Sequence, residues 1–255
     1  MADENLAAVV HHSGGSYPVV AGWGILDDLG RRFLELDLKG PAYIITDSNV
    51  MNPYGRQAQL ALQKHGIAAH IFIIPAGETS KSFSIVQSIY DWLVERRAER
   101  GHPIIAVGGG VVGDLAGFVA ATFLRGVPFV QVPTSMAAMV DASIGGKVAV
   151  NLPQAKNLVG AFYQPRGVFA DVQALSTLGK RELAEGWAEV RENLAPDHAG
   201  LHQADPPPPE ACPSAACGSP APRPLHSPPC YSTPTLLVLP SHPAPSIPRV
   251  TPDLL

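Results

Sequence analysis

The chain has 255 residues, the length of one or two ordinary domains. Its formal net charge is −4 and it has no block of basic residues, which argues against nucleic acid or membrane as a partner. The composition changes abruptly along the chain: 17 of the 26 prolines and all three cysteines lie in residues 191–255, whereas 22 of the 24 glycines lie before them. We expect residues 1–190 to fold and residues 191–255 to be disordered or polyproline-like.

Two features of the chain bear on its cellular location. The sequence opens Met1-Ala2-Asp3-Glu4, without the basic start and apolar run of a signal peptide. Residues 1–190 contain no cysteine, which suits a reducing compartment, so we expect a cytoplasmic protein. The three cysteines lie among prolines without a CxxC pair, and we expect no zinc site there; they are Cys212, Cys217 and Cys230.

Short apolar runs bounded by glycine, proline or polar residues are typical of buried strands. In chain order these runs are Tyr17–Ala21, Ala42–Thr46, His70–Pro75, Ile104–Val107 and Phe129–Val132. Helical patterns lie between them, near residues 26–36 and 54–65 and most clearly at Val86, Ile89, Tyr90 and Leu93. The alternation predicts an α/β fold, with a Rossmann-like, mainly parallel sheet and helices on both faces.

Residues 104–124 have the length of a membrane span and carry only one charge, Asp114. Burying that carboxylate in lipid would cost about 2.5 to 3.5 kcal/mol, and five glycines interrupt the segment. A strand, a glycine loop and a helix from Asp114 to Phe123 account for every residue. We therefore expect no membrane span.

Polar groups and glycines follow the predicted strands, at the sheet edge where open α/β sheets bind ligands. They are Asp47, Gly77-Glu78, Gly108–Gly110 and Thr134-Ser135. Carboxylates suit ribose hydroxyls and a glycine loop suits phosphates, so the pattern predicts a dinucleotide at this edge. Residues 108–113 have the G-x-G-x-x-G spacing, but the acidic residue expected about 20 positions later is missing. A purely structural glycine turn is the alternative; otherwise Asp47 and Glu78 take the ribose role.

Three cations follow or flank the glycine loop: Arg125, Lys147 and Lys156. Each could be an ordinary surface charge, but their proximity in sequence favours a phosphorylated or carboxylated substrate. Three glutamates have helical spacing, which by itself is typical of a solvated helix face; they are Glu182, Glu185 and Glu189.

Five segments together closely resemble bacterial-type 3-dehydroquinate synthase. They are GGGVVGDLAGFVAATFLRG, QVPTS, VDASIGGK, KNLVGAFYQP and ELAEGWAEV, in this order within residues 17–190. Related sugar phosphate cyclases and, more distantly, glycerol dehydrogenases share parts of the pattern. The resemblance implies an NAD-binding α/β domain in residues 1–180 and the start of a helical metal-binding domain in residues 181–190.

The resemblance also implies an activity. The substrate would be a sugar phosphate, 3-deoxy-arabino-heptulosonate 7-phosphate, and the products 3-dehydroquinate and phosphate, in aromatic amino-acid biosynthesis. Bound NAD would transiently oxidise a ring hydroxyl and so permit phosphate elimination, while a divalent metal, zinc or cobalt, would polarise the oxygens. The family further implies a homodimer.

By the same resemblance, individual residues receive roles. The adenosine contacts fall on Asp47, Glu78 and Lys81, the pyrophosphate loop on Gly110, Val111, Val112, Gly113 and Asp114, and the paired hydroxyls on Thr134 and Ser135. Further cofactor contacts fall on Lys147, Lys156 and Thr177, and the catalytic groups on Asp141, Lys147, Asn157 and Arg125. Arg125 would reach substrate phosphate across the dimer interface, and Glu189 would be the first metal ligand.

The sequence departs from the family after Val190. Glu192 stands where the family has a lysine, and the family's two metal-binding histidines should fall within the proline-rich tail. The histidines there lack the family's glycine-histidine context; they are His198, His202, His226 and His242. A catalytic zinc needs about three protein ligands, so we expect little or no turnover from the chain as written.

Three interpretations stay open. The first is a 3-dehydroquinate synthase whose terminal region is replaced through a frameshift, a misread exon or a truncation. The second is a non-catalytic NAD-binding module, and the third is a related cyclase that makes an inosose or a valiolone.

Overall fold

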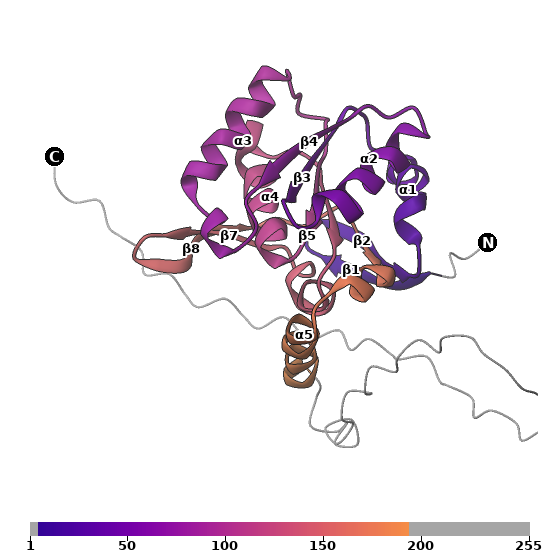
Figure 1. The fold of residues 1–255 in the computed structure, drawn as a ribbon. Helices are drawn as coiled ribbons and strands as arrows, with labels where there is room; N and C mark the ends of the chain where they lie inside the picture. The colour runs from indigo at the N-terminus through magenta and orange to yellow at the C-terminus, as the bar shows by residue number, and fades with distance from the viewer. Residues whose placement is uncertain (1–4, 194–255) are drawn as a thin grey trace, which may run out of the picture. The chain divides into compact units, whose positions relative to one another are not determined.

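The computed structural model describes residues 5–193, which form a seven-stranded sheet, a separate hairpin and helices (Figure 1). The sheet order is β1-β2-β9-β6-β5-β3-β4, and every neighbouring pair is parallel except β1 with β2. Its strands are β1 (Leu6–His12), β2 (Gly15–Gly22), β3 (Ala42–Asp47), β4 (Ala69–Ile74), β5 (Ile104–Gly108), β6 (Phe129–Pro133) and β9 (Gly167–Asp171). The hairpin pairs β7 (Lys147–Leu152) with β8 (Ala155–Phe162).

The helices cover both faces of this sheet. They are α1 (Leu29–Glu35), α2 (Arg56–Gln63), α3 (Phe83–Glu95), α4 (Gly110–Thr122) and α5 (Lys180–Asn193). Short helical turns join them: η1 (Ile25–Asp28), η2 (Met51–Gly55), η3 (Glu78–Ser80), η4 (Phe123–Arg125), η5 (Ala138–Ala142) and η6 (Val172–Thr177). The predicted Rossmann-like, mainly parallel α/β fold is therefore confirmed.

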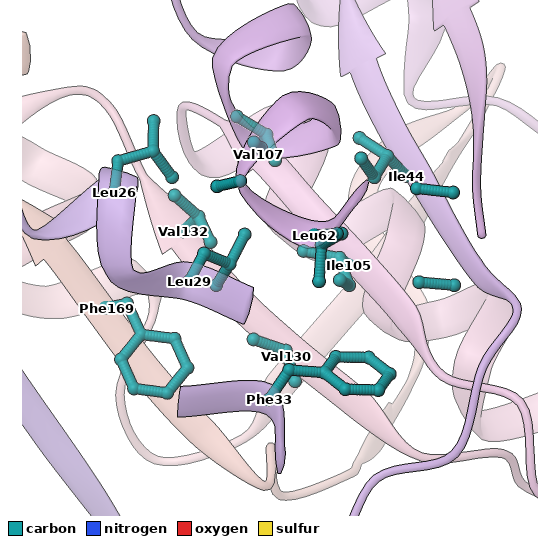
Figure 2. Close-up of a cluster of buried hydrophobic side chains, with 14 of the residues drawn as sticks. Leu26, Leu29, Phe33, Ile44, Leu62, Ile105, Val107, Val130, Val132 and Phe169 are labelled. Atoms are coloured by element: carbon teal, nitrogen blue, oxygen red, sulfur yellow. The ribbon is translucent and has the colours of Figure 1, made fainter. Parts of the chain in front are cut away.

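Two hydrophobic cores lie on opposite faces of the sheet. One packs α1 and α2 on the sheet, and Figure 2 shows Phe33 of α1 beside Val130 of β6 and Leu62 of α2 beside Ile105 of β5. The other packs α3 and α4 on the opposite face, where Tyr43 is the strand residue next to Ile44. Successive strand residues point to opposite faces. Strands buried on both faces therefore appear in the sequence as continuous apolar runs.

The order of the parallel strands creates a switch point beside the glycine loop. From β3 the chain crosses to β4 on one side and then returns to β5 on the other side of β3. Ligands of open α/β sheets bind where the strand order reverses, outside the carboxyl ends. Here those ends carry Asp47 of β3 and Gly108 of β5.

The five predicted strands and the helices between them are present, with one corrected boundary. Residues 104–124 form β5, α4 and part of η4, and α4 begins at Gly110 instead of Asp114 because the glycines themselves adopt the first helical turn. Three parts were not predicted: β1, β9 and the hairpin of β7 and β8. Within residues 5–193, no helix combines the length and the hydropathy that a membrane crossing requires.

The proline-rich segment falls almost wholly outside the described residues. The predictions for its cysteines and histidines fall there too, so they stay predictions. These residues are Cys212, Cys217, Cys230, His198, His202, His226 and His242.

Candidate cofactor and catalytic site

The glycine loop places the start of α4 at the carboxyl end of β5. Gly109 is the N-cap of α4, and no side chain caps this helix. The first N–H groups of a helix have no partner within the helix, so this end suits an anion. A Cβ added to Gly109 would lie 3.3 Å from Ser135 Oγ. Ser135, the second residue of the predicted hydroxyl pair, therefore lies directly against the loop.

Two glycines of the motif have a packing role. A Cβ at Gly108 would lie 2.6 Å from Val112 Cγ2, and one at Gly113 would lie 2.8 Å from Gln131 Oε1. These contacts are shorter than van der Waals distance, so a side chain at Gly108 would clash with Val112, and one at Gly113 would require Gln131 to move. The structural explanation of the motif thus applies to Gly108 and Gly113, whereas Gly109 and Gly110 lie at the open start of α4, where binding of an anion stays a prediction.

The carboxylates after β3 and β4 are placed in different ways. Asp47 Oδ1 accepts hydrogen bonds from the N–H groups of Asn49 (2.8 Å) and Val50 (3.0 Å), which fixes the turn after β3. Glu78 begins η3, after the edge strand β4. Since β3 and β4 are parallel neighbours, both carboxylates lie at the same edge of the sheet.

Lys81 connects the loop after β4 with α4 and with the hairpin. Its Nζ forms an ion pair with Asp114 Oδ2 and donates a hydrogen bond to Asn157 Oδ1. The Lys81 side chain is 5% exposed and that of Asp114 is 20% exposed. An ion pair this little exposed is screened weakly by salt, so it fixes the first turns of α4 relative to the hairpin.

Burial raises the pKa of the Asp114 carboxyl above its ordinary value, and the hydrogen bond from Lys81 offsets this only in part. A carboxylate close to a phosphate-binding helix end would repel the phosphate. Lys81 neutralises this charge, so the helix end keeps its favourable field for an anion.

The hairpin brings the predicted cation Lys156 and the predicted catalytic residue Asn157 to the same edge. Lys156 Nζ lies 3.9 Å from Glu78 Oε1. Asn151, a residue not predicted from the sequence, donates from Nδ2 to the same Glu78 oxygen at 2.7 Å. The signal for it was the apolar alternation of Val148 and Val150 in β7, which indicates a strand and hence a hairpin at the next turn.

The other predicted contacts lie on neighbouring elements. Lys147 Nζ lies 3.7 Å from Asp141 Oδ1, which joins the start of β7 to η5. Thr134 is buried, and its N–H donates to the carbonyl of Gly108 at 3.0 Å. Thr177 is the last residue of η6, and its hydroxyl hydrogen-bonds the hydroxyl of Tyr54 in η2 at 2.9 Å.

The three glutamates of α5 have different surroundings. Glu182 accepts a hydrogen bond from the Gly179 N–H (2.6 Å), and Glu185 pairs with Arg181 on the exposed face. Glu189 is half-buried, one turn beyond Gly186, whose added Cβ would lie 2.5 Å from Met136 Cβ. Glu189 therefore lies on the side of α5 that packs toward η5. The solvated-face explanation holds for Glu185 and does not cover Glu189.

Arg125 lies away from the other predicted cations. It follows α4, whose 13 residues span roughly 20 Å, so it is at the opposite end of the helix from Gly110. Arg125 therefore does not share the edge of the sheet at which Lys156 lies, and its role across a dimer interface stays a prediction. Its side chain is exposed, and it forms no ion pair with the described part of the chain.

A metal site would need further ligands. Among residues 5–193 no group of three or more histidine, cysteine, aspartate or glutamate side chains is arranged to hold a metal ion. Glu189 is thus one possible ligand, and the described residues by themselves do not fit a catalytic metal.

Comparisons with known proteins point to one family. Residues 71–185 match the family described as 3-dehydroquinate synthase N-terminal. The chain is 52% identical over 177 residues to 3-dehydroquinate synthase of Symbiobacterium thermophilum, a match that covers 68% of this chain and 49% of that protein. The chain spans about half the length of the curated relatives it matches.

Solved structures show the same fold at lower identity. A 2-deoxy-scyllo-inosose synthase complexed with carbaglucose-6-phosphate, NAD⁺ and Co²⁺ is 31% identical, with a TM-score of 0.69 over 73% of this chain and 50% of that one. A 2-epi-5-epi-valiolone synthase from Streptomyces hygroscopicus with NAD⁺ and Zn²⁺ is 32% identical, with a TM-score of 0.63 over 72% and 50%. The part of this chain that the family and sequence matches cover belongs to the 3-dehydroquinate synthase family. It corresponds to the N-terminal domain of that family.

Proposed function

We propose that residues 5–193 hold NAD at the carboxyl edge of the sheet and form the cofactor half of a 3-dehydroquinate synthase. The observation that carries this proposal is the contact between Lys81, Asp114 and Asn157, which closes the start of α4 against the hairpin. The homologous part of the chain, residues 71–185, includes all three residues. Two cyclases of similar fold are described with NAD⁺ bound.

The geometry suits each part of the dinucleotide. The uncapped start of α4, at Gly110, Val111 and Val112, would receive the pyrophosphate through backbone N–H groups. Asp47 and Glu78 would accept hydrogen bonds from ribose hydroxyls. When bound, NAD would supply a hydride acceptor; the protein would orient it and keep the Asp114 charge neutralised through Lys81.

The substrate would bind beside the cofactor, where Asp141 and Lys147 form an ion pair. Lys147 is a compact cation that can accompany a phosphate or a developing oxyanion, and Asp141 can accept a hydroxyl hydrogen bond. We propose the sugar phosphate class of substrate on this basis. Glu189 would contribute one metal ligand, with the remaining ligands supplied from elsewhere.

We propose a homodimer in which Arg125 serves the site of the second subunit. Arg125 is separated from Gly110 of its own chain by the whole of α4, so a phosphate bound at the glycine edge is beyond its reach. Leu124, its neighbour in the chain, is 39% exposed, and Phe162, which precedes the Tyr163 that lies against Gly126, is 85% exposed. The cytoplasmic location and the lack of nucleic-acid or membrane partners stay predictions from the sequence.

An inosose or valiolone synthase is the second candidate. The structural neighbours named above carry such names. Their identity to this chain, 31% and 32%, is lower than the 52% of the 3-dehydroquinate synthase from Symbiobacterium thermophilum. We therefore place 3-dehydroquinate synthase first.

Phosphate release tests the proposal. The full chain would be incubated with 3-deoxy-arabino-heptulosonate 7-phosphate, NAD and Zn²⁺, and its NAD binding would be measured separately by calorimetry. Because the proline-rich tail departs from the family after Val190, we expect NAD binding with little or no phosphate release. Sustained turnover would contradict the expected inactivity, and no binding at millimolar NAD would contradict the cofactor site.

A further inference from the structure

Asn151, near the end of β7, connects three segments of the cofactor edge. Its Nδ2 donates to Glu78 Oε1 at 2.7 Å, and its Oδ1 accepts from the Asn157 N–H at 3.0 Å. Its own N–H donates to the carbonyl of Lys81 at 2.8 Å. A single residue therefore links η3, the segment that follows it and the start of β8.

The two ends of the Asn151 amide cannot be exchanged. A carboxylate only accepts hydrogen bonds and a backbone N–H only donates, so Nδ2 must face Glu78 and Oδ1 must face Asn157. Aspartate has the same shape but would place an acceptor beside the Glu78 carboxylate. The two contacts thus require asparagine at this position.

The contact determines which oxygen of Glu78 stays available. Oε1 receives the Asn151 amide and lies 3.9 Å from Lys156 Nζ. In the described part of the chain, Oε2 receives no hydrogen bond from protein. Since a carboxylate that is held in one orientation loses less entropy when it binds a ribose, Asn151 prepares Glu78 for a ligand.

The second contact supports an unusual backbone. Asn157 has a φ of 57°, in the left-handed region that non-glycine residues seldom adopt. Its N–H is held by Asn151, while its side-chain oxygen accepts from Lys81 Nζ. Asn151 therefore also stabilises the conformation in which Asn157 reaches Lys81.

We propose that Asn151 is a positioning residue that orients Glu78 toward the adenosine ribose of the dinucleotide and thereby sets the preference for NAD over NADP. This inference rests on the proposed cofactor site. A fixed carboxylate accepts hydrogen bonds from a free 2′-hydroxyl and repels a 2′-phosphate. Once Glu78 can rotate freely, it favours NAD less and opposes NADP less.

Calorimetric titration of the full chain with NAD and NADP tests the inference. The variants are Asn151→Ala, Asn151→Asp and Glu78→Gln, and the matched control is Gln154→Ala, an exposed position in the same hairpin turn. Thermal unfolding would establish that each variant is folded. For Asn151→Ala we expect NAD affinity to fall about tenfold, the effect of one hydrogen bond to a charged group. NADP affinity would fall less, so the ratio of the two affinities narrows.

Asn151→Asp separates the two contacts. It retains an acceptor for the Asn157 N–H and loses only the donor to Glu78, so we expect NAD affinity to fall at least as much as in Asn151→Ala. Wild-type NAD affinity in Asn151→Asp, or an equal loss of NAD and NADP affinity in Asn151→Ala, would overturn the positioning role.

The variants also separate this inference from the proposed function. If Glu78→Gln weakens NAD binding while Asn151→Ala behaves like Gln154→Ala, the cofactor site stands and the role of Asn151 is refuted. If the wild-type chain does not bind NAD, or Glu78→Gln binds it unchanged, the assignment of the ribose site itself is refuted.

Discussion

The two ends of α4 differ in the contacts that other residues of the same chain make with them. At the start, Asp114 pairs with Lys81, and Lys81 also contacts Asn157 of the hairpin. At the other end, Leu124 and Arg125 have positive φ values of 49° and 67°, and both side chains are exposed. Residues of one chain thus build the glycine end, whereas at the other end the Leu124 and Arg125 side chains are exposed.

The hairpin touches both ends, which explains the contrast. The start of β8 carries Asn157 to the glycine end, and the far end of β8 lies beside Gly126, where an added Cβ would be 3.1 Å from the Tyr163 hydroxyl. Leu158 and Phe162 of β8 are 68% and 85% exposed. The same small element contacts the glycine end of α4 and exposes apolar side chains along β8.

Asp114→Ala should have the largest effect. It leaves the Lys81 ammonium, 5% exposed, without its carboxylate. Removing one partner of a buried ion pair costs about 3 kcal/mol, so we expect the free energy of unfolding to fall by this amount in urea denaturation. The control is Asp91→Ala on the exposed face of α3, for which we expect a change within about 0.5 kcal/mol. Equal effects of the two variants would show that the Asp114 pair does not fix this end of α4.

Gly117→Ala should have the next largest effect. An added Cβ would lie 2.3 Å from Val148 Cγ1 and 3.0 Å from Phe129 Cε1, both in buried side chains that cannot easily move. Overpacking of this kind costs about 1 to 3 kcal/mol. The control is Gly101→Ala, where a Cβ meets nothing within 4 Å. A stable Gly117→Ala protein would mean that the hairpin does not pack closely on α4.

The pH dependence of stability should reflect Asp114. Burial raises its pKa above the ordinary value of 3.8, so the native state binds more protons than the unfolded chain between the two pKa values. Its contribution to stability is therefore complete below the ordinary pKa and declines as pH rises through the native pKa. Relative to Asp114→Asn, the unfolding free energy of the wild type should fall from about pH 4 toward neutral pH. The opposite slope would mean that Lys81 outweighs burial.

Phe162→Ser and Arg125→Ala should leave the stability of the single chain almost unchanged. Both side chains are exposed, and exposed substitutions usually change stability by less than about 0.5 kcal/mol. We expect Phe162→Ser to weaken dimerisation in analytical ultracentrifugation. Dimers of unchanged affinity would place the interface elsewhere.

The structure could be predicted best where a residue pattern is compatible with only one kind of secondary structure. Buried parallel strands such as Ile104–Val107 must be apolar along their whole length, and the glycines after them mark the turn into α4. Most of the sheet and the position of the glycine loop could therefore be predicted. The roles of Lys81 and Asn157 came from the family resemblance, since nothing local in their surroundings indicates that they touch.

The unpredicted elements owe their conformation to distant partners. The strand β9, Gly167–Asp171, is short and begins with glycine, and it is buried because β6 and β2 flank it. The terminal residue of this strand, Asp171, accepts hydrogen bonds from the N–H groups of Gly24 and Leu26, about 145 residues earlier in the chain. Asn151 was missed for the same reason, because its three partners belong to other segments.

Calorimetric titration with NAD tests the contrast between the two ends of α4 most directly. The proteins to compare are the wild-type full chain, Glu78→Gln and Arg125→Ala. We expect the wild type to bind NAD, Glu78→Gln to bind it roughly ten- to a hundredfold more weakly through loss of a charged hydrogen bond, and Arg125→Ala to bind it as the wild type does. No heat from the wild type at millimolar NAD, or equal losses in the two variants, would contradict a cofactor site built at the glycine end of one chain.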